Sequence, residues 1–326
     1  MPGSAGRIGR VEQPTESAAL AQWDAEKPRL TVLAYNMLGV WAQAEDVVSE
    51  VAEQLLKLTP AATEQVRNWP AFLTTLATRR AIDVLRSAQR QRTDYVGEWL
   101  PEPVGQLALP EDEVLSRSML HLGVLFLLEE LSPQARAAYV LHHALGYKAA
   151  EIAEVLETSP DAVRQLLSRA GKELGHAEAP SSEASETWSL LSHVVAAIRH
   201  GDAEGLVRLM ATDAVLYSDG GGKARAALNP VLGAQRIARF LVGVERRNPG
   251  RSVFLGEANA APALLFKLHN RQDLVAIEVS AGHIQTILLV SNPNKLTHAN
   301  AQWTCCTGSG RRVPRGAKFL KSLLIQ

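Results

Sequence analysis

The segment that most constrains the fold is residues 148–170, which read KAAEIAEVLETSPDAVRQLLSRA. The pattern predicts two short helices joined by a tight turn. Ser159 can cap the second helix, and Pro160 suits its first position, where the N–H that proline lacks would have no partner. Val163 and Leu166 then point inward. An ordinary helical hairpin is the alternative. The pattern favours a helix-turn-helix, which places its second helix in the major groove of DNA.

Two further features of this segment agree with that interpretation. Ala153 is small at the point where the first helix must approach the second. Arg164, Ser168 and Arg169 fall on the outer face of the second helix. Outward arginines can contact phosphates or base edges, so this face is a candidate for DNA recognition.

The charge distribution separates two neighbouring surfaces. The chain of 326 residues has a formal net charge of zero, so its overall charge says nothing about nucleic acid. Residues 24–64 contain 7 acidic and 3 basic side chains, whereas residues 67–92 contain 6 basic and 1 acidic. Such polarity within one small domain suggests two surfaces with different partners.

Cysteine content and hydropathy exclude several classes of protein. Cys305 and Cys306 are the only cysteines, so no disulfide framework can form, and a zinc site would need other ligands. The N-terminus lacks an apolar signal core, and no apolar run approaches the ~20 residues that a membrane span needs. We expect a cytoplasmic protein with no metal, no cofactor and no membrane partner.

Hydrophobic periodicity predicts a helical first half. Residues 1–18 are rich in Gly, Pro and Ser and are expected to be disordered. Apolar stripes predict helices over 30–38 and 44–58, and a third helix starts near residue 69. The polar side of the third helix carries Arg79, Asp83, Arg86 and Arg90. Three arginines on one face can bind phosphates or base edges, a solvated face being the alternative.

The second half has a different pattern. A proline-containing linker at 93–118 includes Trp99 and Leu100, which we expect to dock on another surface because they would be costly to leave in water. A second helical domain follows. Beyond it, two helices precede a strand at 214–218, a helix at 233–244 and four strand-like runs, which predict an α+β layer. These runs are residues 252–255, 262–268, 273–279 and 283–291.

The motifs together resemble a bacterial sigma factor of the extracytoplasmic-function (ECF) group, in the subgroup with a fused SnoaL-like C-terminal domain. Residues 33–39 (LAYNMLG) and 44–48 (AEDVV) look like the polymerase-binding part of sigma region 2. Residues 71–75 (AFLTT) and 78–87 (TRRAIDVLRS) look like the part that melts and reads the −10 element. The helix-turn-helix corresponds to region 4. Three motifs mark the subgroup: WLPEP at 99–103, DGGGK at 219–223 and NPNKL at 292–296.

The resemblance implies a multidomain fold, with two all-α sigma domains followed by an α+β SnoaL-like domain that has a curved, cystatin-type sheet. The implied boundaries are 1–18 for the N-terminus, 19–92 for region 2, 93–118 for the linker, 119–175 for region 4, 176–186 for a second linker, 187–296 for the SnoaL-like domain and 297–326 for a basic tail.

The resemblance also implies four sets of functional residues. The −10 contacts would be Arg79, Arg80, Asp83, Arg86 and Arg90. The −35 contacts would be Arg164, Gln165, Ser168, Arg169 and Lys172. Core polymerase would bind Leu38, Glu45, Asp46 and Glu50. The interdomain regulatory set would be Trp99, Leu100, Pro101, Asp219, Gly220, Gly221, Gly222, Lys223, Asn292 and Lys295.

The implied partners are promoter DNA and core RNA polymerase, through the clamp helices of the largest subunit and the flap of the second subunit. We expect the free protein to be a monomer. Trp69 and Phe72 are candidates for supporting melted bases, although Phe72 fits a core position equally well. Glu157 stands where the family usually has glycine, and a left-handed glutamate there costs about 1 kcal/mol.

The third domain leaves alternatives open. An enzyme would need a tuned carboxylate or histidine beside a partner, and the candidates form no recognisable pair by spacing. They are Asp213, Asp219, Glu257, Glu278 and His193. The glycine-rich motif lacks the P-loop frame, so we expect a tight turn that presents Lys223 to another domain. A small-molecule ligand in the pocket of this domain stays open.

We therefore expect a regulatory domain that docks on region 2 and on the Trp99 motif, in a promoter-specificity subunit without enzymatic activity. The alternatives are a polymerase-independent, ligand-sensing helix-turn-helix regulator, and a SnoaL-like cyclase or isomerase fused to a helical module.

Overall fold

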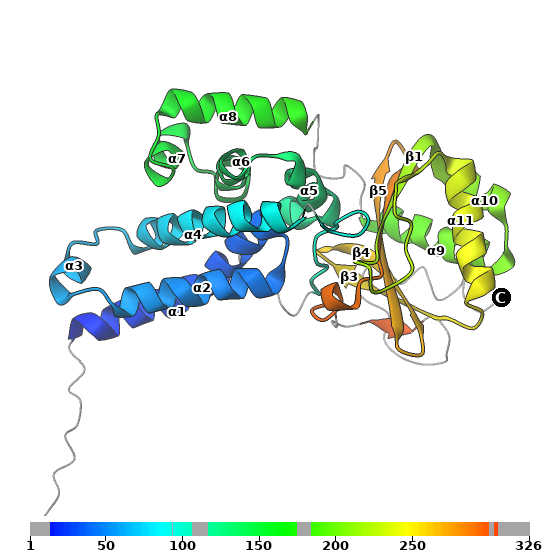
Figure 1. Cartoon of the computed structure of the whole chain (residues 1–326), viewed down its shortest axis with the longest axis horizontal. Coiled ribbons are helices and arrows are strands. Elements are labelled where there is room, and N and C mark those ends of the chain that lie inside the picture. Colours follow the sequence, from blue (N-terminus) through cyan, green and yellow to red (C-terminus); the bar gives the residue numbers. More distant parts are fainter. Residues whose placement is uncertain (1–13, 93, 106–116, 175–183, 300–302, 306–326) are drawn as a thin grey trace, which may run out of the picture.

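The computed structural model describes residues 14–92, 94–105, 117–174, 184–299 and 303–305. Helices form one end of this part of the molecule, and a sheet with covering helices forms the other (Figure 1). Among the described residues, no helix is both long and apolar enough to cross a membrane.

The first helical group contains α1 (Pro14–Leu38), α2 (Trp41–Leu56), α3 (Pro60–Glu64) and α4 (Trp69–Arg92). Helix α1 begins at Pro14, so the expectation of disorder through residue 18 is wrong for residues 14–18, and residues 1–13 lie outside the described part. Proline is tolerated in a first helical turn, and the residues that follow are mostly good helix formers. Gly39 follows the last residue of α1 with φ of 67°, a conformation that glycine adopts readily at the end of a helix.

The second helical group contains η2 (Arg117–Leu120), α5 (Leu122–Leu127), η3 (Leu128–Glu130), α6 (Pro133–Leu145), α7 (Ala149–Val155) and α8 (Pro160–Glu173). Ser132 caps α6 by accepting a hydrogen bond from the N–H of Ala135 at 3.3 Å, and Pro133 takes the first helical position. The combination of serine cap and proline that the sequence predicts at Ser159 and Pro160 is therefore also present at the start of α6.

The two helical groups share one hydrophobic core. Helix α6 packs against α1 and α4, and α7 also contacts α4. Arg136 of α6 is 2 % exposed and donates a hydrogen bond across this boundary to the carbonyl oxygen of Met37 at 2.9 Å. Its second partner is the carboxylate of Glu129 at 2.6 Å, and burial lowers the pKa of Arg136 to about 9.

The C-terminal domain has three helices, α9 (Ala184–His200), α10 (Ala203–Leu209) and α11 (Ala234–Arg247). Its strands are β1 (Met210–Asp219), β2 (Val231–Leu232), β3 (Ser252–Ala258), β4 (Ala261–Leu268), β5 (Arg271–Ser280), β6 (His283–Val290) and β7 (Thr304–Cys305). They form one sheet in the order β2-β1-β6-β5-β4-β3-β7. The β1–β6 pair is parallel and the other pairs are antiparallel.

Side-chain alternation gives this sheet two apolar faces. Leu264 and Phe266 of β4 pack under α9, α10 and α11, whereas Leu265 packs on the opposite face. The opposite face is covered by Leu100 of the linker and by Leu122 of α5. Both the linker and region 4 therefore rest on the C-terminal domain.

Two predicted boundaries of this domain need correction. Helix α9 begins at Ala184, inside the segment expected to be a linker through residue 186, and residues 175–183 lie outside the described part. At the other end, β7 pairs with β3, so ordered structure continues past the predicted limit at residue 296. Gly256 is required there, because a Cβ atom would collide with the ring of Trp303. Cys306 and the rest of the predicted tail lie outside the described residues.

Candidate nucleic-acid and polymerase interfaces

The predicted helix-turn-helix is formed by α7 and α8. Ser159 accepts a hydrogen bond from the N–H of Ala162 at 3.2 Å, which caps α8 as predicted. Val163 is fully buried. The five predicted −35 contacts are exposed on α8, namely Arg164, Gln165, Ser168, Arg169 and Lys172. Arg164 also pairs with Asp161 at 2.5 Å within the same helix.

The turn between α7 and α8 contains a left-handed glutamate that contacts α4. Glu157 has φ of 52°, so the left-handed conformation expected at this position is present. Its carboxylate lies 2.8 Å from the guanidinium group of Arg79 on α4. The same guanidinium donates to the carbonyl oxygens of Val155 at 3.0 Å and Glu154 at 3.3 Å. A predicted −10 residue is thus bound to the turn of the −35 module.

The other predicted −10 residues on α4 are also partly engaged. Arg80 pairs with Glu50 of α2 through two hydrogen bonds, one of them 2.8 Å long, so a predicted DNA contact binds a predicted polymerase contact. Asp83 and Arg86 lie 3.6 Å apart on the exposed side of α4. The side chain of Arg90 lies outside the described part.

The aromatic candidates for supporting melted bases lie at the start of α4. Trp69 and Phe72 are half-buried and meet edge to face, with ring centroids 5.9 Å apart. Both pack against the shared helical core. Each ring therefore packs on the core with part of its surface and keeps another part exposed.

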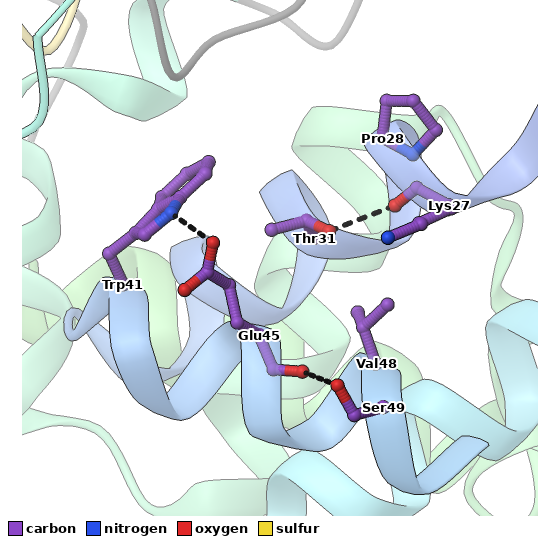
Figure 2. Close-up of a pocket in the computed structure, with 7 residues that line it drawn as sticks. All are labelled: Lys27, Pro28, Thr31, Trp41, Glu45, Val48 and Ser49. Atoms are coloured by element: carbon purple, nitrogen blue, oxygen red, sulfur yellow. Dashed lines mark hydrogen bonds between the residues drawn. The ribbon is translucent and has the colours of Figure 1, made fainter. Parts of the chain in front are cut away.

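A pocket of about 430 Å³ lies between α1 and α2 (Figure 2). Lys27, Pro28 and Thr31 line it from α1, and Trp41, Glu45, Val48 and Ser49 line it from α2. The indole N–H of Trp41 donates to the carboxylate of Glu45 at 3.1 Å, which fixes an acidic group beside an aromatic surface. Two predicted polymerase contacts, Glu45 in this pocket and the next residue of α2, Asp46, are exposed.

Leu38 is a correction to the predicted polymerase-binding set. Its side chain is 0 % exposed and belongs to the shared core, so it cannot contact a partner at the surface. The apolar stripe of α1 points toward α2 and α4, and Leu38 is part of that stripe. The position stabilises the fold of region 2 and does not form its surface.

The three subgroup motifs meet at one buried ion pair. The ammonium group of Lys295 lies 2.6 Å from the carboxylate of Asp219 and 2.5 Å from the carbonyl oxygen of Leu100. It also lies 3.9 Å from the ring centroid of Trp99. The same carboxylate accepts hydrogen bonds from the N–H of Leu100 at 2.9 Å and the hydroxyl of Tyr95 at 2.6 Å. The linker is thereby bound to the C-terminal domain.

The glycine turn after Asp219 does not present Lys223 to another domain, which corrects that expectation. Lys223 is exposed, and the cation that the linker binds is Lys295. Gly221 and Gly222 both have positive φ, and a Cβ atom at Gly221 would collide with the amide of Asn292. The turn itself packs on the linker because its backbone can approach so closely.

Glu102 of the linker makes an interdomain contact that sequence reasoning missed. Its buried carboxylate accepts a hydrogen bond from the N–H of Trp41 at 2.8 Å, at the start of α2. The same carboxylate contacts His298 at 2.6 Å, so it joins α2 to the segment that follows the C-terminal sheet. The sequence contains a signal for this contact. Val40 directly precedes α2, and valine has no side-chain acceptor, so the first N–H groups of α2 need a cap from elsewhere in the chain.

The candidate acid and base groups of the C-terminal domain have separate environments. Asp219 binds Lys295, and Glu278 accepts a hydrogen bond from the N–H of Gly123 in α5 at 3.2 Å. Burial raises the pKa of Glu278 to about 7. Asp213 and His193 are exposed. Within the described residues, no group of three His, Cys, Asp or Glu side chains could hold a metal ion.

Comparison with known families matches residues 23–91 to Sigma-70 region 2 and residues 121–174 to Sigma-70, region 4. The helical half is therefore that of a sigma-70-class transcription initiation factor. The ECF RNA polymerase sigma factor SigJ of Mycobacterium tuberculosis is 33% identical over 294 residues, which cover 85% of this chain and 93% of SigJ. Its crystal structure matches with a TM-score of 0.69 and 28% identity, over 86% of this chain and 98% of the other.

A second relative, described as the probable ECF RNA polymerase sigma factor SigI of Mycobacterium tuberculosis, is 25% identical over 86% of this chain and 96% of its own length. The chain belongs to the ECF RNA polymerase sigma factors and carries the C-terminal SnoaL-like domain of its subgroup. It directs promoter-specific initiation of transcription, together with core RNA polymerase and promoter DNA. Its relatives are sigma factors, which are not enzymes.

Proposed function

We propose that α8 reads the −35 element and α4 reads the −10 element of the promoter. The exposure of all five predicted residues on α8 supports the first assignment. Arg79 and Arg80 are bound to Glu157 and Glu50 in this structure, so the second assignment requires that DNA displaces these carboxylates. A phosphate group can do so, because it offers arginine the same paired anionic oxygens.

We propose that the pocket between α1 and α2 is where the clamp helices of the largest polymerase subunit bind. Glu45 supplies an exposed acidic group to this pocket, and Trp41 and Val48 supply apolar lining. Asp46, the next residue of α2, is also exposed. Charged groups around an apolar centre suit a specific protein partner. Leu38 is not part of this proposal. Region 4 would contact the flap of the second subunit.

The contact between α4 and α7 brings the two DNA-binding modules too close together to read both promoter elements at once. The −10 and −35 elements lie about 25 base pairs apart, which is about 85 Å of DNA at 3.4 Å per base pair. Here Arg79 of the −10 helix lies 3.0 Å from Val155 of the −35 module. Both elements cannot be read together in this closed arrangement, so the two modules must separate on the promoter.

We infer that the C-terminal domain stabilises the closed arrangement by holding both the linker and region 4. Leu100 and Leu122 pack on one face of its sheet, and Glu278 binds the backbone of α5. A binding role for this domain is supported by the contacts of two of its candidate groups, since Asp219 binds Lys295 and the linker and Glu278 binds the backbone of α5.

Two measurements on the full-length protein test these proposals. Energy transfer between labels on α2 and α8 should fall when core polymerase and promoter DNA are added. In run-off transcription, Arg169→Ala should weaken −35 use by about 1–3 kcal/mol, if this arginine reads a base. Arg208→Ala, an exposed arginine of the C-terminal domain, is the matched control and should leave promoter use unchanged. Equal promoter use by both variants would contradict the assignment of α8.

A further inference from the structure

Glu157 combines an unfavourable backbone with a long-range ion pair. The residue lies in the turn between α7 and α8 with φ of 52°, a region in which glycine avoids the strain that a side chain causes. Its carboxylate extends away from its own helices and contacts Arg79 of α4 at 2.8 Å. The Glu157 side chain thus makes a contact between the two modules, whereas glycine would be less strained at this backbone conformation.

The rest of the Arg79 contact makes this pairing specific. The last carbonyl groups of an α-helix have no partner within the helix, and a cation near them is favourable. Arg79 donates to two such groups at the end of α7, the carbonyl oxygens of Glu154 and Val155. The guanidinium group is therefore held by three acceptors of the −35 module, one of which is a full negative charge.

We propose that Glu157 is a latch residue, which holds regions 2 and 4 in the closed arrangement by binding Arg79 until promoter DNA replaces it. The inference rests on the proposed −10 role of Arg79. The DNA backbone and Glu157 offer equivalent anionic oxygens to the same guanidinium group, so binding of one excludes the other. Opening of the protein then also frees Arg79 to contact the −10 element.

The latch is weak enough to be reversible. Both side chains keep substantial exposure, 44% for Arg79 and 73% for Glu157, so water and salt screen the pair. Exposed ion pairs contribute little, and loss of the carboxylate should raise the ratio of open to closed protein by about two- to five-fold. High salt should likewise raise the ratio of open to closed protein in the wild type.

The test uses the full-length protein with fluorophores at Gln54 on α2 and Glu173 on α8, both exposed. Glu157→Gln should shift the distance distribution toward the open form by about two- to five-fold. Glu154→Gln is the matched control, because it removes the same charge from the same module, while Arg79 binds only the carbonyl oxygen of this residue among the contacts described. An unchanged distribution in Glu157→Gln, or an equal shift in the control, would overturn the proposal.

Glu157→Gly separates the latch from the backbone strain. It should open the protein as much as Glu157→Gln does and, unlike that variant, raise the thermal stability, because glycine relieves the strained φ. No opening in the glycine variant would also overturn the latch. Binding of a single-stranded −10 oligonucleotide is measured in parallel. If Glu157→Gln opens the protein without strengthening this binding, the latch is supported and the −10 role of Arg79 is refuted.

Discussion

Lys295→Met tests the buried ion pair at which the three subgroup motifs meet. Methionine keeps most of the volume of the lysine stem but removes the charge. The substitution eliminates the 2.6 Å contact with Asp219 and the 2.5 Å hydrogen bond to the carbonyl oxygen of Leu100. It also removes the cation from the face of Trp99, 3.9 Å away. The carboxylate of Asp219, which is fully buried, loses this counter-charge.

The expected magnitude follows from that geometry. Breaking a buried ion pair by removing one partner costs about 3–5 kcal/mol. Asp219 retains hydrogen bonds from the N–H of Leu100 and the hydroxyl of Tyr95, so the cost should fall near the lower limit. A loss of about 3 kcal/mol would shift the equilibrium between docked and undocked linker by roughly 100-fold.

Hydrogen exchange measures this equilibrium directly, because the N–H of Leu100 is protected by its 2.9 Å bond to Asp219. We expect exchange at Leu100 to become roughly 100-fold faster in Lys295→Met. Lys223→Met is the matched control, since Lys223 is an exposed lysine on the neighbouring glycine turn. Equal exchange at Leu100 in both variants would refute the reasoning. Adding Asp219→Asn to Lys295→Met should restore part of the protection, because no uncompensated charge remains buried.

Two further predictions concern the contacts between the domains. Burial holds the pKa of Glu278 at about 7, above its ordinary 4.5, so the folded state binds its proton more tightly and wild-type stability should fall, relative to Glu278→Gln, as pH rises through this interval. Thermal unfolding followed across this pH range checks it, and parallel curves for the two proteins would contradict it. Glu102→Ala should lower the unfolding free energy by about 1–2 kcal/mol and speed hydrogen exchange at Trp41, because α2 loses its cap. Asp94→Ala, an exposed carboxylate in the same linker, should change neither quantity.

The helix starts were predictable because their causes are local. Ser159 and Ser132 each bond to an N–H three residues ahead, so a short stretch of sequence contains both partners. The alternation that defines the sheet is equally local, and the four predicted strand-like runs overlap β3 to β6. The left-handed turn at Glu157 was also expected, because the family that the sequence resembles usually has glycine at this position.

The candidate sites were predictable only in part. The exposed face of α8 follows from helical periodicity, which assigns each residue to a side of the helix. Periodicity does not say what covers that side. Arg79 lies on the polar face of α4 as predicted, but its partner Glu157 is 78 positions away in the sequence. Leu38 shows the converse error, since a motif resemblance suggested a surface contact where packing makes a core residue.

By itself the sequence determined the two sigma modules, the helix-turn-helix with its caps, the α+β character of the last domain and the motifs that join them. Only the tertiary structure decided that Lys295 and not Lys223 is the buried cation, that Glu102 caps a helix far from it in the chain, and that Arg79 is bound to the other DNA-binding module. The physical reason is the separation along the sequence of the residues that each interaction joins. Caps and amphipathic faces depend on residues within a turn or two of each other, whereas a buried charge or an interdomain hydrogen bond depends on where the packed core brings distant segments together.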